Sequence, residues 1–149
     1  MEKIIIVDYG AGEQGKSAAI KSVYKALSEG FEGVKIENYM DDGDVKAELL
    51  INGYRIGIES QGDPGSRVYA SLKEFVQHDC DMIIVACRTK GDTIKEVQHL
   101  REDGYKVIWA QHMISKDLAF LQTRLNAMYA QNILAVVKMF MENRSEPVS

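Results

Sequence analysis

A chain of 149 residues, of which 46% are hydrophobic and 27% charged, is long enough for one domain with a buried core and too apolar for a disordered protein. Its net charge of −4 argues against general nucleic-acid binding, which usually needs a basic face. No apolar run approaches the ~20 residues of a membrane span, and the run at 4–7 is too short for a signal-peptide core. We therefore expect a cytoplasmic protein with a single domain over residues 1–142 and a disordered polar tail over 143–149.

The first half of the chain alternates apolar runs with turn signals. Its predicted elements are a strand at 4–7, a helix at 16–27, a strand at 34–39, a turn at 41–44, and strands at 46–51 and 54–59. The first strand is continuously apolar, as expected of a strand buried on both faces. The last two flank Asn52-Gly53, the strongest short signal for a β-hairpin.

The second half continues the alternation. Its predicted elements are a helix at 65–77, strands at 82–86 and 105–110, a short helix at 93–102, and a long helix at 115–142. Asp63 suits the N-cap of the first helix and Pro64 its first position, while Ser115 suits the cap of the last. Cys80 and Cys87 lie at the two sides of an extended run, which would hold them roughly 20 Å apart, so we expect no disulfide between them.

Strands alternating with helices predict an α/β fold, a three-layer sandwich around a mostly parallel sheet to which the hairpin adds one antiparallel strand. The last helix would be about 40 Å long, more than a core of this size covers. Its excess length either projects into solvent or forms a homodimer surface.

One sequence motif carries specific chemistry. Residues 10–17 read GAGEQGKS and match G-x-x-x-x-G-K-[ST] without a mismatch, between a buried strand and an amphipathic helix. Glycines let successive backbone N–H groups face an anion, and the helix N-terminus adds positive partial charge. The Lys16 side chain would reach the β- and γ-phosphates of a nucleotide, and the Ser17 hydroxyl would bind Mg²⁺.

On this motif the chain resembles the P-loop NTPase superfamily, and residues 56–63 and 87–91 resemble strand ends in small bacterial P-loop ATP-binding proteins. The resemblance implies a nucleoside triphosphate, first of all ATP, with Mg²⁺. The residues it implies for nucleotide binding are Gly10, Gly12, Glu13, Gln14, Gly15, Lys16, Ser17 and Ala18.

The superfamily also has an acidic residue at the end of a neighbouring strand, and Glu59 occupies that position as the second expected metal ligand beside Ser17. Glu59 and Gly62 resemble the Asp-x-x-Gly of GTPases, with Glu in place of Asp. Gln61 could then orient a water. Glu59 could equally be an ordinary strand-end carboxylate, and Asp8 is a further acid next to the loop.

Arginines could add a late positive charge at the phosphates. Arg88 follows the strand at 82–86, and ligands of open α/β sheets sit at the carboxyl ends of the strands. Arg67 lies at the start of the helix after Gly62 and could act in the same way. We assign Arg88 to the catalytic set with Lys16 and Glu59, and His112 is a further candidate lining residue. Thr89-Lys90-Gly91-Asp92 has the letters of a guanine-reading motif but follows the wrong strand, so we interpret it as a coincidence.

Three functions follow from these residues. The first is Mg-dependent binding, and hydrolysis, of a nucleoside triphosphate. The second is a small-molecule or nucleotide kinase, with Arg67 and Arg88 binding the acceptor phosphate. The third is a non-catalytic switch in which bound nucleotide orders residues 38–46 or 60–67 for a partner.

Overall fold

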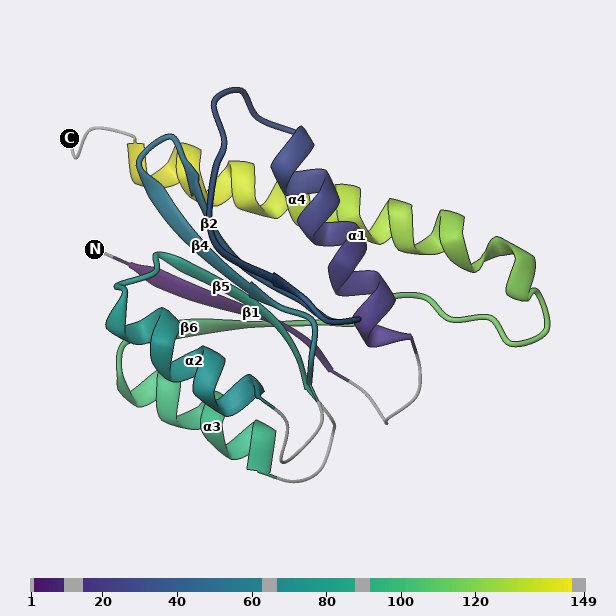
Figure 1. Ribbon diagram of the computed structural model, residues 1–149, viewed down its shortest axis with the longest axis horizontal. Helices are drawn as coiled ribbons and strands as arrows, with labels where there is room; N and C mark the ends of the chain where they lie inside the picture. Colours follow the sequence, from purple (N-terminus) through teal and green to yellow (C-terminus); the bar gives the residue numbers. More distant parts are fainter. Residues whose placement is uncertain (1, 10–14, 63–66, 88–91, 146–149) are drawn as a thin grey trace.

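A computed structural model describes residues 2–9, 15–62, 67–87 and 92–145 of the chain. Six strands form one sheet in the order β2-β3-β4-β5-β1-β6 (Figure 1). The elements are β1 Lys3–Tyr9, α1 Lys16–Glu29, β2 Lys35–Asp41, β3 Val45–Ile51, β4 Tyr54–Glu59, α2 Val68–Gln77, β5 Met82–Cys87, α3 Asp92–Glu102, β6 Tyr105–Ala110, the 3₁₀ turn η1 Ala119–Leu121 and α4 Gln122–Ser145.

The pairing of the strands confirms a mostly parallel sheet. β1 pairs in parallel with β5 and β6, and β4 pairs in parallel with β5. β3 is antiparallel to both of its neighbours, β2 and β4. The predicted hairpin joins β3 to β4, and its turn residues Asn52 and Gly53 have φ values of 51° and 85°. Positive φ at both positions is the geometry that favours Asn-Gly in two-residue hairpins.

Helices cover both faces of the sheet, so the predicted three layers are present. α1 and α4 lie on one face, and α2 and α3 lie on the other (Figure 1). Because side chains alternate along a strand, β1 supplies both cores. Ile4 and Ile6 pack with α1 and α4, whereas Ile5 and Val7 pack with α2 and the residues around it.

The long C-terminal helix is shifted from its predicted bounds. α4 begins at Gln122, and the Ser115 hydroxyl accepts a hydrogen bond from the Leu118 N–H ahead of the 3₁₀ turn, so Ser115 does not cap α4. The intervening Phe120 is 78% exposed and has no core to pack against. At the other end α4 continues to Ser145, so residues 143–145 are helical and are not part of a disordered tail.

Two further expectations can be compared with the structure. Cys80 and Cys87 are both buried free thiols, which confirms that they are not bridged. The predicted cap Asp63 and the adjacent Pro64 lie outside the described residues, and α2 is observed from Val68. In the part of the chain that the structure describes, no helix is both long and apolar enough to cross a membrane.

Candidate functional site at the carboxyl edge of the sheet

The carboxyl ends of the four parallel strands meet at one edge of the sheet. Val7 of β1 is aligned with Val85 of β5 and with Trp109 of β6, and Val85 is aligned with Glu59 of β4. The sequence predicted that Glu59 ends a strand that neighbours β1. In the structure β5 lies between β4 and β1, so the strand that carries Glu59 is not a neighbour of β1. With neighbouring strands about 4.8 Å apart, the backbone of Glu59 lies about 10 Å from that of Val7.

The described part of the predicted phosphate loop is the start of α1. Gly15 has φ 72° and ψ 20°, a left-handed conformation that suits glycine, and its carbonyl accepts the first helical bond from the Ala19 N–H. Lys16 is buried, Ala18 is exposed, and no acidic residue lies in the first turn. The positive end of the helix dipole is thus not offset by a carboxylate of its own helix. Gly10, Gly12, Glu13 and Gln14 lie outside the described residues.

Ser17 faces the turn between β2 and β3. Its hydroxyl donates a 2.5 Å hydrogen bond to Asp44 Oδ1 and lies 3.5 Å from Ser60 Oγ. Ser60, the residue after Glu59, also donates to Asp44 Oδ1 at 2.8 Å, and its hydroxyl accepts from the Val45 N–H. The sheet and α1 therefore bring together one carboxylate and two hydroxyls.

Asp44 carries the negative charge of this group. Burial acts to raise the pKa of Asp44, but hydrogen bonds from Ser17, Ser60 and Gln61 outweigh it and hold the pKa below its usual value. The carboxylate is thus stabilised in its charged form directly beside the Ser17 hydroxyl. Sequence reasoning placed residues 41–44 in a turn and missed this role. The run of three aspartates there was the available signal.

Glu59 is engaged elsewhere. Its side chain is fully buried, and Oε1 accepts hydrogen bonds from Arg67 Nε at 2.7 Å and from Ser71 Oγ at 2.6 Å. Oε2 accepts from a second Arg67 nitrogen at 3.2 Å and from the Gln61 N–H, also at 3.2 Å. Both oxygens of Glu59 are therefore occupied by protein donors.

Arg67 acts as a clamp on the turn before β3. Besides Glu59, its guanidinium donates to Asp42 Oδ2 at 2.8 Å and to the Asp44 carbonyl at 2.9 Å. The pKa of Arg67 is raised above its usual value, mainly because of the hydrogen bond to Glu59. The structure therefore does not leave Arg67 available as a ligand for an acceptor phosphate.

The residues after Glu59 have structural partners as well. Gln61 Oε1 accepts a 2.9 Å hydrogen bond from the Arg67 N–H. A Cβ on Gly62 would lie 2.5 Å from the Ala86 carbonyl oxygen of β5. The glycine of the Glu-x-x-Gly pattern is thus required by close packing of two backbones.

His112 and Asp8 form a buried pair on the other side of α1. His112 Nδ1 lies 2.8 Å from Asp8 Oδ2, and the two side chains are only 3% and 1% exposed. His112 Nε2 faces the start of α1, where a Cβ on Gly15 would lie 3.8 Å from it. The ring of Tyr129 of α4 packs edge-on against His112, with 5.9 Å between ring centroids.

Two buried polar atoms lack partners in the described part of the chain: the second carboxylate oxygen of the pair, Asp8 Oδ1, and the hydroxyl of the adjacent Tyr129. Burial raises the pKa of Tyr129, and the charge of Asp8 raises it further. A small cavity of about 160 Å³ opens beside His112, lined by Tyr9, Lys16, Gln111, His112 and Ile114. Sites for drug-sized ligands usually exceed about 300 Å³, so this cavity can hold only part of a nucleotide.

A separate group of potential metal ligands lies on the α2 side of the sheet. Ligand atoms of Glu48, Glu74 and His78 lie within 4.8 Å of one another. Glu74 forms an ion pair with Lys46, and Glu48 forms one with Arg55 at 3.0 Å. Because both carboxylates are paired with cationic side chains, we interpret the group as a polar network that stabilises the fold.

At the carboxyl end of β5, Cys87 is the last residue that the structure describes before residue 92. Cys87 is buried, and burial raises the pKa of its thiol to about 11, so it suits packing better than nucleophilic attack. Arg88, the third predicted catalytic residue, and the sequence Thr89-Lys90-Gly91 lie outside the described residues.

Comparisons with known proteins assign neither a family nor a function to this chain. No protein family, no curated protein and no solved structure matches the chain significantly.

Proposed function

We propose that the chain binds a nucleoside triphosphate with Mg²⁺ at residues 10–17, with ATP as the first candidate, and that the bound nucleotide is hydrolysed. The observation that carries the proposal is the position of Ser17. It lies in the first turn of α1, next to the buried Lys16, and its hydroxyl faces the Asp44 carboxylate. The complete motif in the sequence supplies the rest of the argument.

The donor set supports Mg²⁺. This ion prefers oxygen ligands and commonly uses one or two carboxylates, keeping several waters. Ser17 and Asp44 would hold it, and Mg²⁺ would neutralise negative charge on the phosphates. Glu59, the ligand expected from the sequence, fits less well because Arg67 and Ser71 occupy its oxygens.

The protein's own residues have defined parts in this proposal. Lys16 and the N-terminus of α1 supply positive charge to the phosphates. His112 approaches the same place from the segment after β6. Its Nε2 faces Gly15, and its Nδ1 is held by Asp8. Both cysteines are unpaired, which fits a reducing cytoplasm.

A nucleotide-dependent switch is the second candidate, and one contact network favours it. Asp44 receives the Ser17 hydrogen bond on its side chain, and its carbonyl accepts one from Arg67. Arg67 in turn binds Asp42 and Glu59. Any ligand that engages Ser17 would therefore act on the turn before β3 and on the start of α2. The kinase alternative is weaker, because Arg67 is bound to Glu59 and Asp42 and is not available to bind an acceptor phosphate.

The test is thermal unfolding with ATP, GTP, ADP or no nucleotide, each with Mg²⁺, for the wild type, Lys16→Ala and the exposed control Lys25→Ala. Ligand at a hundred times its dissociation constant adds about 2.7 kcal/mol to stability, a readily measured melting shift. The proposal expects a shift in the wild type and in Lys25→Ala, absent in Lys16→Ala. Without a shift for any nucleotide, the proposed function is wrong. Where a nucleotide does give a shift, a measurement of phosphate release distinguishes a protein that hydrolyses the nucleotide from a switch without turnover.

A further inference from the structure

The outer face of α4 carries a regular stripe of exposed side chains. The buried residues of α4 include Tyr129, Ile133, Val137 and Met141. The opposite face presents Arg124, Met128, Gln131, Ala135, Met139 and Glu142, all of them exposed. Successive members are three or four residues apart, the spacing by which one helix packs along another.

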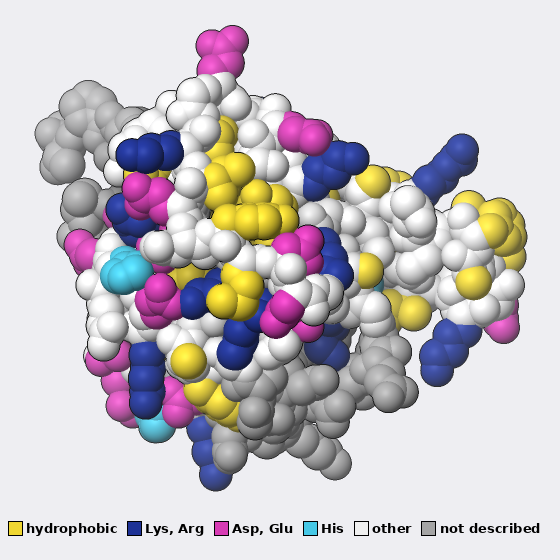
Figure 2. Space-filling view, in the orientation of Figure 1, with side chains coloured by type: hydrophobic (Ala, Val, Ile, Leu, Met, Phe, Trp, Pro, Cys, Tyr) yellow, Lys and Arg dark blue, Asp and Glu magenta, His cyan; other side chains and the backbone are white. Residues whose placement is uncertain are grey.

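Two methionines make this stripe unusual for a solvent-facing surface. Met128 is 62% exposed and Met139 is 59% exposed. The N-terminal end of α4 reaches beyond the sheet (Figure 1), and hydrophobic side chains gather at that end of the molecule (Figure 2). A single exposed methionine is common on a protein surface, whereas an exposed methionine that adjoins further apolar surface marks an interaction site.

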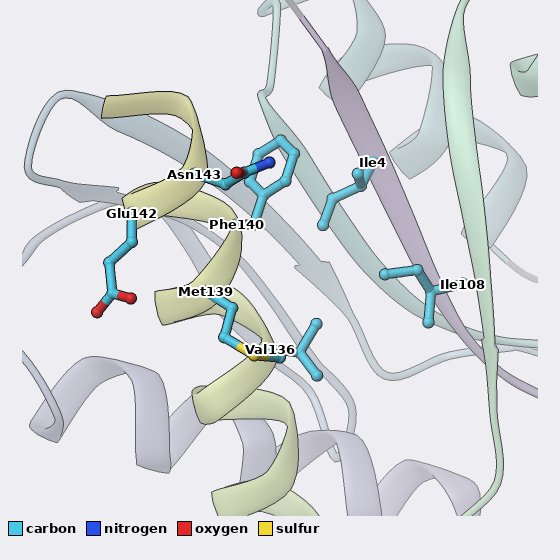
Figure 3. A pocket seen from close by; sticks show the side chains of 7 residues that line it. All are labelled: Ile4, Ile108, Val136, Met139, Phe140, Glu142 and Asn143. Atoms are coloured by element: carbon cyan, nitrogen blue, oxygen red, sulfur yellow. The ribbon is translucent and has the colours of Figure 1, made fainter. Parts of the chain in front are cut away.

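Met139 also forms part of a groove beside the stripe. The groove has a volume of about 460 Å³ and lies between α4 and the edge strand β6. Val136 and Phe140 point from the helix toward Ile4 and Ile108 of the sheet, whereas Glu142 points away from the sheet (Figure 3). An apolar side chain of a partner can therefore enter next to Met139.

The stripe is complementary to itself when it is read in opposite directions. An antiparallel copy places Arg124 against Glu142, Met128 against Met139, and Gln131 against the small Ala135. The midpoint of each pair falls on Ile133 or between Ile133 and Leu134, so a single two-fold axis satisfies all three. Within the described part of the chain, neither Arg124 nor Glu142 has an ion-pair partner.

We propose that the outer face of α4 binds a second copy of this chain, as an antiparallel helix pair with two-fold symmetry. Each copy's Met128 packs against Met139 of the other copy beside the groove, and each Arg124 pairs with Glu142. A two-fold axis uses every contact twice, so two ion pairs and two methionine contacts form along about 27 Å of helix. This inference does not depend on nucleotide binding.

The test is sedimentation velocity of the full chain over a concentration series. The wild type is expected to convert from monomer to dimer as concentration rises. Arg124→Glu and Glu142→Arg each place like charges opposite one another twice and should weaken the dimer by about tenfold or more. The double variant R124E/E142R restores opposite charges and should restore the dimer. Ile36→Ser, an exposed apolar residue on β2, is the matched control and should leave the dimer unchanged.

A second measurement fixes the direction of the helices. Met128→Cys mixed with Met139→Cys should form a disulfide-linked dimer, whereas Met128→Cys alone should form very little. The native cysteines are buried and do not compete. A wild type that stays monomeric at its highest soluble concentration would overturn the proposal. So would a dimer that resists both single charge changes, a double variant that does not recover, or efficient cross-linking of Met128→Cys with itself.

Discussion

Ser17 of α1 donates a 2.5 Å hydrogen bond to the carboxylate of Asp44, which lies in the turn between β2 and β3. The contact joins the first turn of α1 to the turn between β2 and β3, beside Ser60 at the carboxyl end of β4. It gives the proposed Mg²⁺ site a carboxylate from a turn, where the sequence suggested one from a strand end. Experiments can distinguish Asp44 from Glu59 as the Mg²⁺ ligand, because the two carboxylates contact different residues.

Asp44→Asn should remove the Mg²⁺-dependent part of nucleotide stabilisation. The amide keeps an oxygen that accepts from Ser17 but loses the negative charge that favours the ion. The measurement is the melting shift with ATP as Mg²⁺ is titrated, and we expect a shift that no longer responds to Mg²⁺.

Glu59→Gln is the comparison for that experiment. It should lower stability without ligand by about 1–3 kcal/mol, because Arg67 loses the charge of its buried partner and keeps only the exposed Asp42 carboxylate. Its Mg²⁺ response should persist. If Glu59→Gln abolishes the response and Asp44→Asn preserves it, Glu59 and not Asp44 is the metal ligand.

Sequence reasoning succeeded where local patterns decide the outcome. Continuous apolar runs predicted β1 and β5, Asn52-Gly53 predicted the hairpin, and helical spacing predicted α1, so the mostly parallel sheet and the antiparallel β3 followed. Strand order is different, because it depends on contacts between distant segments. The sequence gives no local sign that β5 inserts between β1 and β4.

The same limit applies to the contacts at the site. Asp44 and Ser17 are 27 residues apart, and Asp8 and His112 are 104 residues apart. Neither pair has a spacing motif. Gly62 matched a functional pattern by its letters, although packing against Ala86 is enough to require glycine there.

The His112–Asp8 pair should be energetically coupled. Asp8→Ala and His112→Ala each remove one side of a buried hydrogen bond, so the double variant should lose less stability than the two single variants together. A coupling energy of about 1–3 kcal/mol is expected. Urea-induced unfolding of the four proteins measures it, with the exposed His99→Ala as a control. Additive effects would show that the two side chains stabilise the fold independently.

Glu48 should make stability depend on acid pH. Its side chain is fully buried, with Asn38 Nδ2 at 2.8 Å, His78 Nδ1 at 2.7 Å and an Arg55 nitrogen at 3.0 Å. Burial acts to raise the pKa of Glu48, but these three hydrogen bonds outweigh it and lower the pKa. The pKa in the folded state is then below that of the unfolded chain, which is about 4.3.

The sign of the effect follows from that order. The contribution of Glu48 is fully present above the unfolded pKa and is lost as pH falls through the folded pKa. Glu48→Gln should therefore destabilise most near pH 7 and least at about pH 2–3. Free energies of unfolding measured across this range test it, with the exposed Glu32→Gln as control. An equal loss at every pH would mean that the charge of Glu48 contributes nothing.

Two glycines should respond differently to alanine, because what they contact differs. A Cβ on Gly57 of β4 would lie 2.5 Å from the ring of the buried Phe75, a side chain that can be replaced by a smaller one. A Cβ on Gly62 would meet the Ala86 backbone instead. Each substitution overpacks the interior and should cost about 1–3 kcal/mol or more. Phe75→Leu should recover part of the stability lost in Gly57→Ala and none of that lost in Gly62→Ala, as measured by urea unfolding. Recovery of Gly62→Ala by Phe75→Leu would contradict the close contact between the Gly62 segment and β5, and with it the packing explanation for the Glu-x-x-Gly sequence.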